Sequence, residues 1–272
     1  MLSKAPPEAV APLVARVRAQ LKRNRRQVLD SAAGLHELLK KDPTWVQDLV
    51  ALAAFGRVHK VHVYVQPGGL DTIRPLPGEA PAALSYEVAG LQFEFTPTSF
   101  IQVNGEMNEV LVAEAMAHLQ MTEGMRVLDL FCGLGNFTLP IAAAGARALG
   151  IEGEASLVKL GRANAARNGI EHAVFEEQNL YQDPARAAWA GMSWDRVLLD
   201  PPRTGAEEVV RVLGSMKPPR IVYVACGPES LARDAGILVG EFGYELEAAG
   251  VVDMFPHTAH FESIAVFSRP GE

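Results

Sequence analysis

Acidic and thiol side chains occur where several apolar segments of this 272-residue sequence end. Glu152 closes "ALGIE", Asp200 follows "VLL" and Cys226 follows "IVYVA", while Asp129 lies within "VLDLF". In open α/β sheets the ligand binds beyond the carboxyl ends of the strands, so these side chains would meet at one edge. A carboxylate can accept hydrogen bonds from ribose hydroxyls, and a thiolate can attack a substrate covalently. We therefore expect a nucleotide-like ligand and a nucleophile at the same edge.

A glycine-containing loop, "FCGLGNF" (residues 131–137), follows the first of these segments and leads into a helix of small residues. Gly133 and Gly135 allow a ligand to approach the backbone closely. Their spacing departs from the G-x-G-x-x-G motif of dinucleotide-binding folds, which stay an open alternative. With Glu152 after the second strand, "DLFCGLGNF" instead resembles the S-adenosylmethionine loop of class I methyltransferases.

The segment "VLLDPPRTG" (residues 197–205) places Asp200 before two prolines, which fix the direction of the chain after the strand. Amino-group methyltransferases carry a similar acidic or amide residue before two prolines, followed by an aromatic residue. Here the next residue is Arg203, whose planar guanidinium can contact a phosphate or stack on a base. The alternative is a turn that ends the strand and leaves Arg203 on the surface.

Cys226 ends the apolar run of "IVYVACGPES", and Gly227 and Pro228 then bend the chain away. The following segment predicts a helix, whose N-terminus would favour a thiolate. The alternative for a single cysteine is a small buried apolar residue. Cys132, in the glycine loop, is the competing thiol, and we expect it to serve packing.

The C-terminal segment "DMFPHTAHFESIAVF" (residues 253–267) contains two histidines and one acid. His257 and His260 have no third ligand nearby in the sequence, so we expect structural histidines and no metal site. Glu262 precedes an apolar strand and is a candidate proton acceptor.

Strand and helix patterns divide the sequence near residue 105. Residues 1–104 predict a smaller α+β region, with helices over 6–55, a strand from Lys60 and a hairpin around Ala89 and Gly90. Residues 105–272 alternate apolar strands with amphipathic helices, which predicts an α/β domain with a doubly wound, mainly parallel sheet. The expected strands are "RVLDLF", "ARALGIEG", "AVFEEQ", "DRVLLDPP", "RIVYVAC", "YELEAAGVVDMF" and "FESIAVFSR".

Charge is distributed unevenly along the chain, whose net charge is −7. Residues 1–60 carry 11 Lys and Arg against 5 Asp and Glu, whereas the remainder carries 14 against 27. The basic run at residues 16–27 would contact phosphates or form a solvated helix face. Two distant cysteines and the lack of a signal peptide or long apolar stretch lead us to expect a soluble, cytoplasmic protein that does not bind membranes.

Five ordered motifs resemble the RNA uracil-C5 methyltransferase family, and within it the bacterial 23S rRNA 5-methyluridine branch. The resemblance covers roughly residues 57–269. It rests on "FTPTSFIQVNGEMNEVLV", "VLDLFCGLGNFTLP", "VLLDPPRTG", "IVYVACGPESLARD" and "DMFPHTAHFES". It implies a class I methyltransferase fold, S-adenosylmethionine as cofactor and RNA as partner, most specifically 23S rRNA, with tRNA as the alternative.

The resemblance also implies roles for individual residues. Cys226 would be the nucleophile that adds to uracil C6, and Glu262 would remove the C5 proton. Phe100 and Arg203 are candidates for contact with the RNA base, and core packing is the alternative for Phe100. The expected S-adenosylmethionine contacts, including the loop glycine, are Gln102, Phe131, Gly133, Asn136, Glu152, Asn179 and Asp200.

The sequence departs from this branch at two features. Its members commonly carry an N-terminal β-barrel and cysteines that hold an iron–sulfur cluster, but no cysteine precedes Cys132, so we expect no such cluster in this chain. Gly227 stands where the branch commonly has Asn. A cytosine-C5 methyltransferase and a non-catalytic module that binds RNA and cofactor stay open as alternatives.

Overall fold

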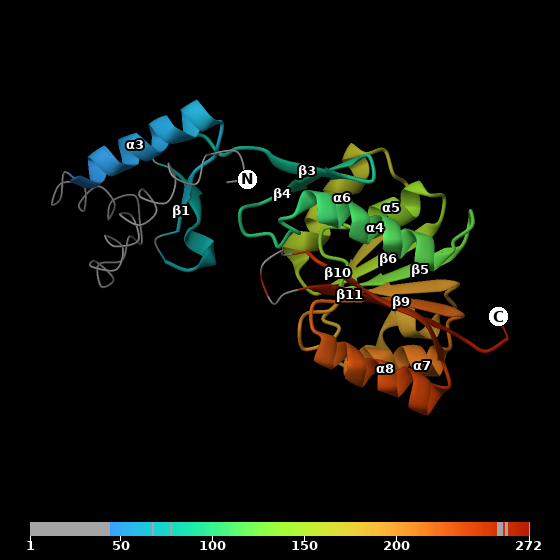
Figure 1. Ribbon diagram of the computed structural model, residues 1–272. Helices are drawn as coiled ribbons and strands as arrows, with labels where there is room; N and C mark the ends of the chain where they lie inside the picture. The colour runs from blue at the N-terminus through green and yellow to red at the C-terminus, as the bar shows by residue number, and fades with distance from the viewer. Residues whose placement is uncertain (1–43, 67, 77, 255–257, 259–260, 272) are drawn as a thin grey trace. The chain divides into compact units, whose positions relative to one another are not determined.

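The computed structural model describes residues 44–272 except 67, 77, 255–257, 259–260 and 272. The basic run at residues 16–27, the predicted helices before residue 44, His257 and His260 lie outside this range. The chain divides into two compact units (Figure 1). Unit 1 comprises residues 1–84 and 96–99, and unit 2 comprises residues 85–95 and 100–272. The predicted domain boundary at residues 104/105 lies inside unit 2 and stays a prediction.

Unit 1 contains helix α3 (Thr44–His59), a short 3-10 helix (Leu70–Thr72) and two short strands. The strands β1 (Tyr64–Val65) and β2 (Arg74–Pro75) pair antiparallel. The strand predicted from Lys60 is therefore much shorter than its alternating pattern suggested. Lys60 has a left-handed backbone, with φ of 53°, and separates the helix from the segment that leads to β1.

Unit 2 is built on a seven-stranded sheet with the order β10-β11-β9-β8-β5-β6-β7. The strands β5 to β9 are mutually parallel, and β11 pairs antiparallel with both β9 and β10. All seven predicted strands are present, which confirms the mainly parallel, doubly wound sheet. Their bounds are β5 (Arg126–Leu130), β6 (Arg147–Glu152), β7 (Ala173–Glu177), β8 (Arg196–Leu199), β9 (Arg220–Ala225), β10 (Glu245–Val252) and β11 (Glu262–Ser268).

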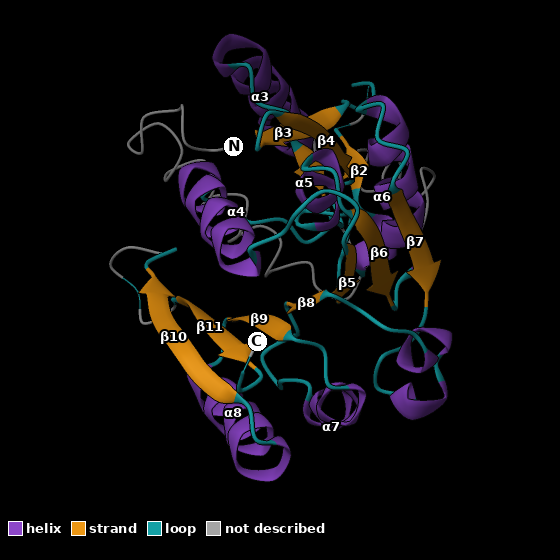
Figure 2. Cartoon of the chain, turned by 90° about the vertical axis from the view of Figure 1, so that its right-hand side faces the viewer, coloured by secondary structure: helices purple, strands orange, loops and turns teal. Residues whose placement is uncertain are grey.

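Helices cover both faces of this sheet because successive strand side chains point to opposite faces. Val127 of β5 packs on one face with helices α4 (Gly105–Leu119), α5 (Thr138–Ala143) and α6 (Ala155–Arg167). Leu128 packs on the other face with α7 (Glu207–Met216) and α8 (Pro228–Phe242). Figure 2 shows the two sets of helices on either side of the strands. Two 3-10 helices (Pro184–Arg186 and Ala188–Gly191) lie between β7 and β8.

The predicted hairpin is formed by β3 (Leu84–Val88) and β4 (Leu91–Phe95). Ala89 and Gly90 between them both have positive φ, as a tight two-residue turn requires. Asn164 of α6 and Asn168, which caps the end of that helix, form hydrogen bonds with the backbone of β4. Asn164 bonds to the backbone N–H and C=O of Glu94, and Asn168 does the same at Gln92. The hairpin is thereby attached to α6.

No helix in the described part of the chain is long and apolar enough to cross a membrane.

Helix α6 lies so close to β7 that residue 161 has no room for a side chain. A Cβ on Gly161 would lie 2.6 Å from the ring of Phe175, and one on Gly135, in the glycine loop, would lie 2.9 Å from the same ring. Phe175 is buried and thus sets the spacing of both the helix and the loop. The glycine content of this region therefore reflects close packing around one aromatic ring.

We predict that Gly161→Ala lowers the free energy of unfolding by about 1–3 kcal/mol, because the added methyl group overpacks Phe175. Gly236→Ala is the matched control, since Gly236 also lies in a helix but a Cβ there meets nothing within 4 Å. This control should raise the stability by about 0.5–1 kcal/mol through helix propensity. Urea denaturation of both variants measures the difference, and equal effects would contradict the proposed packing constraint.

Candidate active site

A cavity of about 500 Å³ opens in unit 2 beyond the carboxyl ends of the parallel strands. Every site residue predicted from the sequence lines it, although these residues come from segments spread over more than 160 positions of the chain. The predicted residues in its wall are Phe100, Gln102, Phe131, Gly133, Asn136, Glu152, Asn179, Asp200, Arg203, Cys226 and Glu262. The fold therefore brings all of them together.

Strand pairing places Cys226 and Glu262 side by side. Ser263 of β11 pairs with Ala225 of β9 in the antiparallel register. Cys226 follows Ala225 and Glu262 precedes Ser263, so both lie at the same end of neighbouring strands. Glu262 is 4% exposed, whereas Cys226 is half-buried and free of any disulfide. The site thus combines an accessible thiol with a buried carboxyl group.

The glycine loop is held to the end of β6 by Glu152. The Glu152 carboxylate accepts a hydrogen bond from the Gly133 backbone N–H at 3.0 Å and another from Glu154 N–H at 2.9 Å. Phe131, at the start of the loop, has a left-handed backbone with φ of 64°, and its ring lies 5.6 Å from that of Tyr181. These contacts give the loop a defined shape around the cavity.

Cys132 has a packing role, as expected. It is 4% exposed, and its Sγ lies 2.8 Å from the position that a Cβ on Gly150 would occupy. Burial, with smaller effects from Asp129 and Glu152, raises the pKa of this thiol well above its ordinary value. Cys132 is therefore unsuited to act as a nucleophile.

The carboxyl groups at this edge are held in an environment that disfavours their charge. Burial raises the pKa of Asp129 to about 7, partly offset by the Thr138 hydroxyl, which donates to it at 2.5 Å. Burial and the nearby Glu262 raise the pKa of Asp200 well above its ordinary value. Burial also raises the pKa of Glu262, against a lowering effect of Arg203. A Glu with a raised pKa is a stronger proton acceptor.

The pKa of Cys226 is also raised, which differs from the low value expected from the following helix. Burial is the largest cause, followed by the negative charges of Glu262 and Asp200. A hydrogen bond and the positive charge of Arg203 act in the opposite direction. The helix follows Cys226 directly in the sequence, whereas the two carboxylates reach the thiol only through the fold.

Several residues that line the cavity, or that bond to its wall from behind, were not predicted from the sequence. The Tyr86 hydroxyl donates to Asn136 Oδ1 at 3.0 Å, and Asn108 exchanges two hydrogen bonds with the Asn136 amide. Tyr181 lines the cavity beside Asn179, whose Oδ1 accepts the Tyr181 backbone N–H. The only available sequence signal was the position of Tyr181 in the loop after a strand, where ligand contacts are common.

Phe100 and Gln102 enter the cavity from the segment before α4. Phe100 is 78% exposed, so the alternative of core packing is wrong. Among the described residues, Oε1 of Gln102 is one of three buried side-chain nitrogen or oxygen atoms without a hydrogen-bond partner. A buried amide oxygen of this kind is suited to accept a hydrogen bond from a ligand.

The segment that carries Arg203 is fixed to helix α8 by several side chains. Asp234 is fully buried, and its Oδ2 accepts hydrogen bonds from the Ala206 N–H at 2.8 Å and the Tyr223 hydroxyl at 2.7 Å. Arg233 pairs with Asp234 and donates to the Thr204 carbonyl. Ser230 donates to the Arg203 carbonyl at 2.9 Å. Arg203 and Cys226 thus stand on segments that are tied to the same helix.

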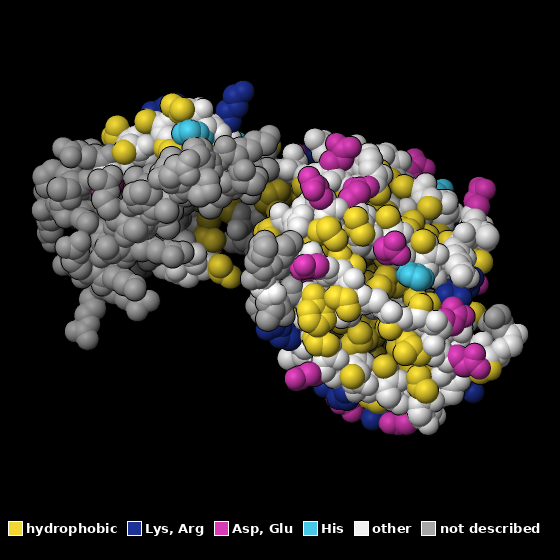
Figure 3. Space-filling model, viewed as in Figure 1, with side chains coloured by type: hydrophobic (Ala, Val, Ile, Leu, Met, Phe, Trp, Pro, Cys, Tyr) yellow, Lys and Arg dark blue, Asp and Glu magenta, His cyan; other side chains and the backbone are white. Residues whose placement is uncertain are grey.

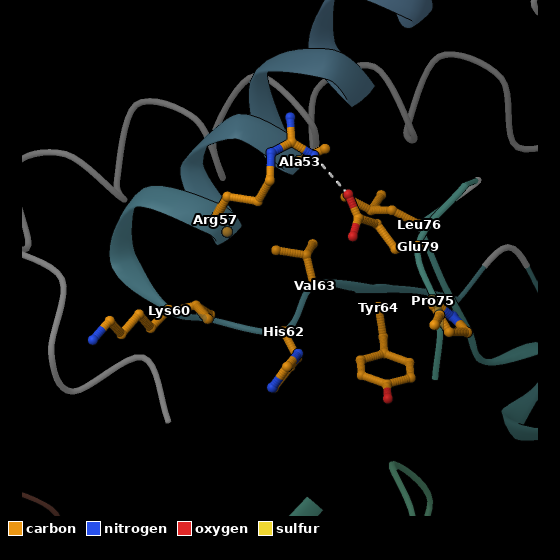
Figure 4. Close-up of a pocket in the computed structure, with 12 residues that line it drawn as sticks. Ala53, Arg57, Lys60, His62, Val63, Tyr64, Pro75, Leu76 and Glu79 are labelled. Atoms are coloured by element: carbon orange, nitrogen blue, oxygen red, sulfur yellow. Dashed lines mark hydrogen bonds and ion pairs between the residues drawn. The ribbon is translucent and has the colours of Figure 1, made fainter. Parts of the chain in front are cut away.

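A separate hollow of about 330 Å³ lies in unit 1 (Figure 4). Arg57, Lys60 and His62 contribute to its wall, and Arg57 pairs with Glu79 at 2.7 Å. None of the site residues predicted from the sequence lines it.

In unit 2, Figure 3 shows Asp and Glu side chains scattered over the visible face rather than gathered in one patch.

We predict that alkylation of Cys226 by iodoacetamide rises with pH at a more alkaline midpoint than that of an ordinary cysteine. Glu262→Gln should lower the midpoint because it removes a negative charge that disfavours the thiolate, and Arg203→Met should raise it. Mass spectrometry of the modified peptide, in a Cys132→Ser background, measures both shifts. Midpoints that do not respond to either substitution would show that these charges do not act on the thiol.

We predict that Asp234→Asn lowers the free energy of unfolding by roughly 1–3 kcal/mol, because the buried carboxylate holds three partners. Asp183→Asn is the control, since Asp183 pairs with Arg186 while both side chains are exposed, and should change the stability by less than about 0.5 kcal/mol. Thermal or urea denaturation compares them. Equal effects would mean that Asp234 does not fix the Arg203 segment.

Comparison with known proteins finds that this chain is similar to RNA uracil-C5 methyltransferases. The family model described as tRNA (uracil-5-)-methyltransferase matches residues 81–178 and 187–269. The 23S rRNA (uracil(1939)-C(5))-methyltransferase RlmD of Stenotrophomonas maltophilia strain K279a is 50% identical over 224 residues, covering 82% of this chain and 50% of that protein. The protein of the same name from Xanthomonas campestris pv. campestris strain 8004 is 48% identical over 228 residues, covering 84% and 51%. The chain spans about half the length of the curated relatives it matches.

Solved structures agree with the predicted class I methyltransferase fold. The tRNA (uracil-54, C5)-methyltransferase of Pyrococcus abyssi, solved with S-adenosyl-L-homocysteine, is 30% identical with a TM-score of 0.58, covering 68% of this chain and 44% of that one. The putative transferase PH0793 of Pyrococcus horikoshii has the same TM-score of 0.58 at 17% identity, covers 81% and 83%, and supports the fold alone. By its motifs, its sheet and its matched residues, this chain belongs to the tRNA (uracil-5-)-methyltransferase family.

Proposed function

We propose that this protein transfers a methyl group from S-adenosylmethionine to uracil C5 in RNA, with 23S rRNA as the substrate. The observation that carries the proposal is the placement of Cys226 beside Glu262, in the wall of the same cavity as the glycine loop. A thiol and a carboxyl group at the ends of neighbouring strands can act on the two adjacent carbons of one pyrimidine ring. The sequence similarity to 23S rRNA methyltransferases supports the choice of substrate.

The described residues of the cavity fit S-adenosylmethionine. Glu152, Asp200 and Glu262 contribute carboxyl groups, and Arg203 is the single Lys or Arg in the wall, so the cavity suits a positively charged ligand. The Gln102 oxygen without a partner can accept a hydrogen bond from it. The loop around Gly133 and the carboxylate of Glu152 suit the nucleoside part. When bound, the cofactor would supply an electrophilic methyl group.

The reaction at the base depends on two side chains of this chain. Cys226, after losing its proton, adds to uracil C6, and the electrons of the C5–C6 double bond move to form an enolate that makes C5 nucleophilic. Once C5 carries the new methyl group, the Glu262 carboxylate takes the C5 proton. The released electron pair re-forms the double bond and expels the Cys226 thiolate. Both catalytic groups are thereby restored once Glu262 gives up its proton.

The remaining residues of the cavity would bind and orient the substrates. Arg203 favours the thiolate of Cys226 and lies where it can contact the base or its phosphate. Phe100 offers an exposed ring on which an unstacked base can lie. A base paired within folded RNA must first be turned out to reach the thiol. The cytoplasmic location expected from the sequence is part of this proposal.

We predict that the protein forms a covalent adduct with RNA that contains 5-fluorouridine, when the cofactor is present. Fluorine at C5 cannot leave as a proton, so elimination is blocked and the enzyme stays attached through Cys226. Cys226→Ala should abolish the adduct, and Cys132→Ser should retain it. Denaturing gel electrophoresis with 23S rRNA fragments and with tRNA measures attachment and identifies the RNA that is used.

Glu262→Gln separates the two covalent steps. This variant should lose about 10²- to 10⁴-fold in methylation rate and accumulate an adduct with ordinary uridine-containing RNA, since the C5 proton is not removed. An adduct that survives Cys226→Ala would refute the nucleophile. No adduct of the wild-type protein with any 23S rRNA or tRNA fragment would instead favour the alternative of a non-catalytic binding relative.

A further inference from the structure

A groove of about 740 Å³ adjoins the catalytic cavity in unit 2 and shares two residues with it. The shared residues are Arg203 and Cys226, so the thiol is bordered by both spaces. The other residues of the groove are Thr204, Gly227, Pro228, Glu229, Ser230, Arg233 and Phe261. Gly133 of the glycine loop and Glu152, which bonds to it, line only the cavity.

A uracil that reacts with Cys226 stays joined to its ribose and to the phosphates on either side. The cavity has to hold the cofactor as well as this base, so the RNA backbone must leave it near the thiol. We propose that the groove beside Cys226 binds the ribose-phosphate backbone of the RNA strand next to the target nucleotide. This inference rests on the proposed function and adds to it the path of the substrate strand.

The donors in the groove suit phosphate oxygens. Arg203 and Arg233 contribute guanidinium groups, which bind phosphates with charge-assisted hydrogen bonds, and Thr204 contributes a hydroxyl group. The Arg233 side chain is 44% exposed. Its Nε and Nη2 are held by Asp234, Nη2 also donates to the Thr204 carbonyl, and Nε lies 3.6 Å from Glu207. This pairing fixes the direction of the guanidinium before any ligand arrives. A pre-oriented group loses less conformational freedom when it binds.

The wall of the groove has a fixed shape because glycine allows two of its segments to touch. A Cβ on Gly205 would lie 2.6 Å from Arg233 Nη2 and 2.8 Å from Asp234, and one on Gly227 would lie 2.9 Å from the Arg203 carbonyl oxygen. Ser230 donates hydrogen bonds to the carbonyls of Arg203 and Gly227. The groove is thus a built feature of the segments that carry the nucleophile.

Glu229 is an exposed acid in the wall of the groove and would repel a phosphate bound there. Replacing it with a positively charged residue therefore tests whether the groove binds phosphate. The test uses the whole chain and 5-fluorouridine-containing RNA, and it measures the RNA concentration that gives half-maximal adduct formation. Glu229→Lys should lower this concentration by about 3- to 10-fold, and the gain should shrink as salt is added. Glu241→Lys makes the same charge change near the other end of α8, about 18 Å away along the helix axis, and should change it by less than about 2-fold.

A second measurement tests for phosphate itself. The nucleotide 5-fluorouridine 3′,5′-bisphosphate should inhibit adduct formation at a concentration at least about 5-fold lower than the nucleoside 5-fluorouridine, and Glu229→Lys should widen this ratio. Equal inhibition by the two compounds, or equal gains from Glu229→Lys and Glu241→Lys, would overturn the groove and leave the proposed function standing. A wild-type protein that forms no adduct with any RNA would overturn the proposed function first.

Discussion

The antiparallel pairing of β11 with β9 is the constraint on which the arrangement of the candidate site depends. Because β11 runs against its neighbour, its first residue lies at the same edge as the last residue of β9. This single reversal brings Glu262 beside Cys226, which is 36 positions earlier in the chain. A parallel β11 would place Glu262 at the opposite edge. The buried ladder between the two strands therefore fixes the relation of acid and thiol.

Electrostatics at this edge follow from the same convergence. The fold places Asp200 and Glu262 in the wall of the cavity and the fully buried Asp129 close enough to act on Asp200, and burial raises the pKa of each. The thiol of Cys226 is affected in the same direction, with Arg203 as the opposing charge. An arrangement that disfavours negative charge in the free protein is well matched to a positively charged ligand. Burial disfavours the charged forms of these carboxyl groups in the free protein, and a bound positive charge would favour them.

Glycines let the backbone at the site pack closely against neighbouring side chains. Gly135 and Gly161 meet the ring of Phe175, and Gly205 meets Arg233 and Asp234. These contacts fix the glycine loop and the Arg203 segment, both of which line the cavity. Asp234 does not line the cavity. Its carboxylate accepts a hydrogen bond from the Ala206 N–H and so holds the segment that follows Arg203. The cavity and the adjoining groove share Arg203 and Cys226 in their walls, and both residues stand on segments that are bonded to, or lead into, α8.

The sequence by itself determined the seven strands of the large sheet in unit 2, its mainly parallel arrangement and the residues at the strand ends, because buried strands leave continuous apolar runs and their polar ends stand out. It also singled out Cys226 and Glu262 as the candidate nucleophile and the candidate proton acceptor. Only the tertiary structure decided that these two are neighbours, that Phe100 is exposed rather than in the core, and that the pKa of Cys226 is raised. It further revealed Tyr86, Asn108 and Asp234 as supports of the site. The physical reason is that hydrophobic periodicity is local, whereas strand order, burial and the charges around a group arise from residues far apart in the chain.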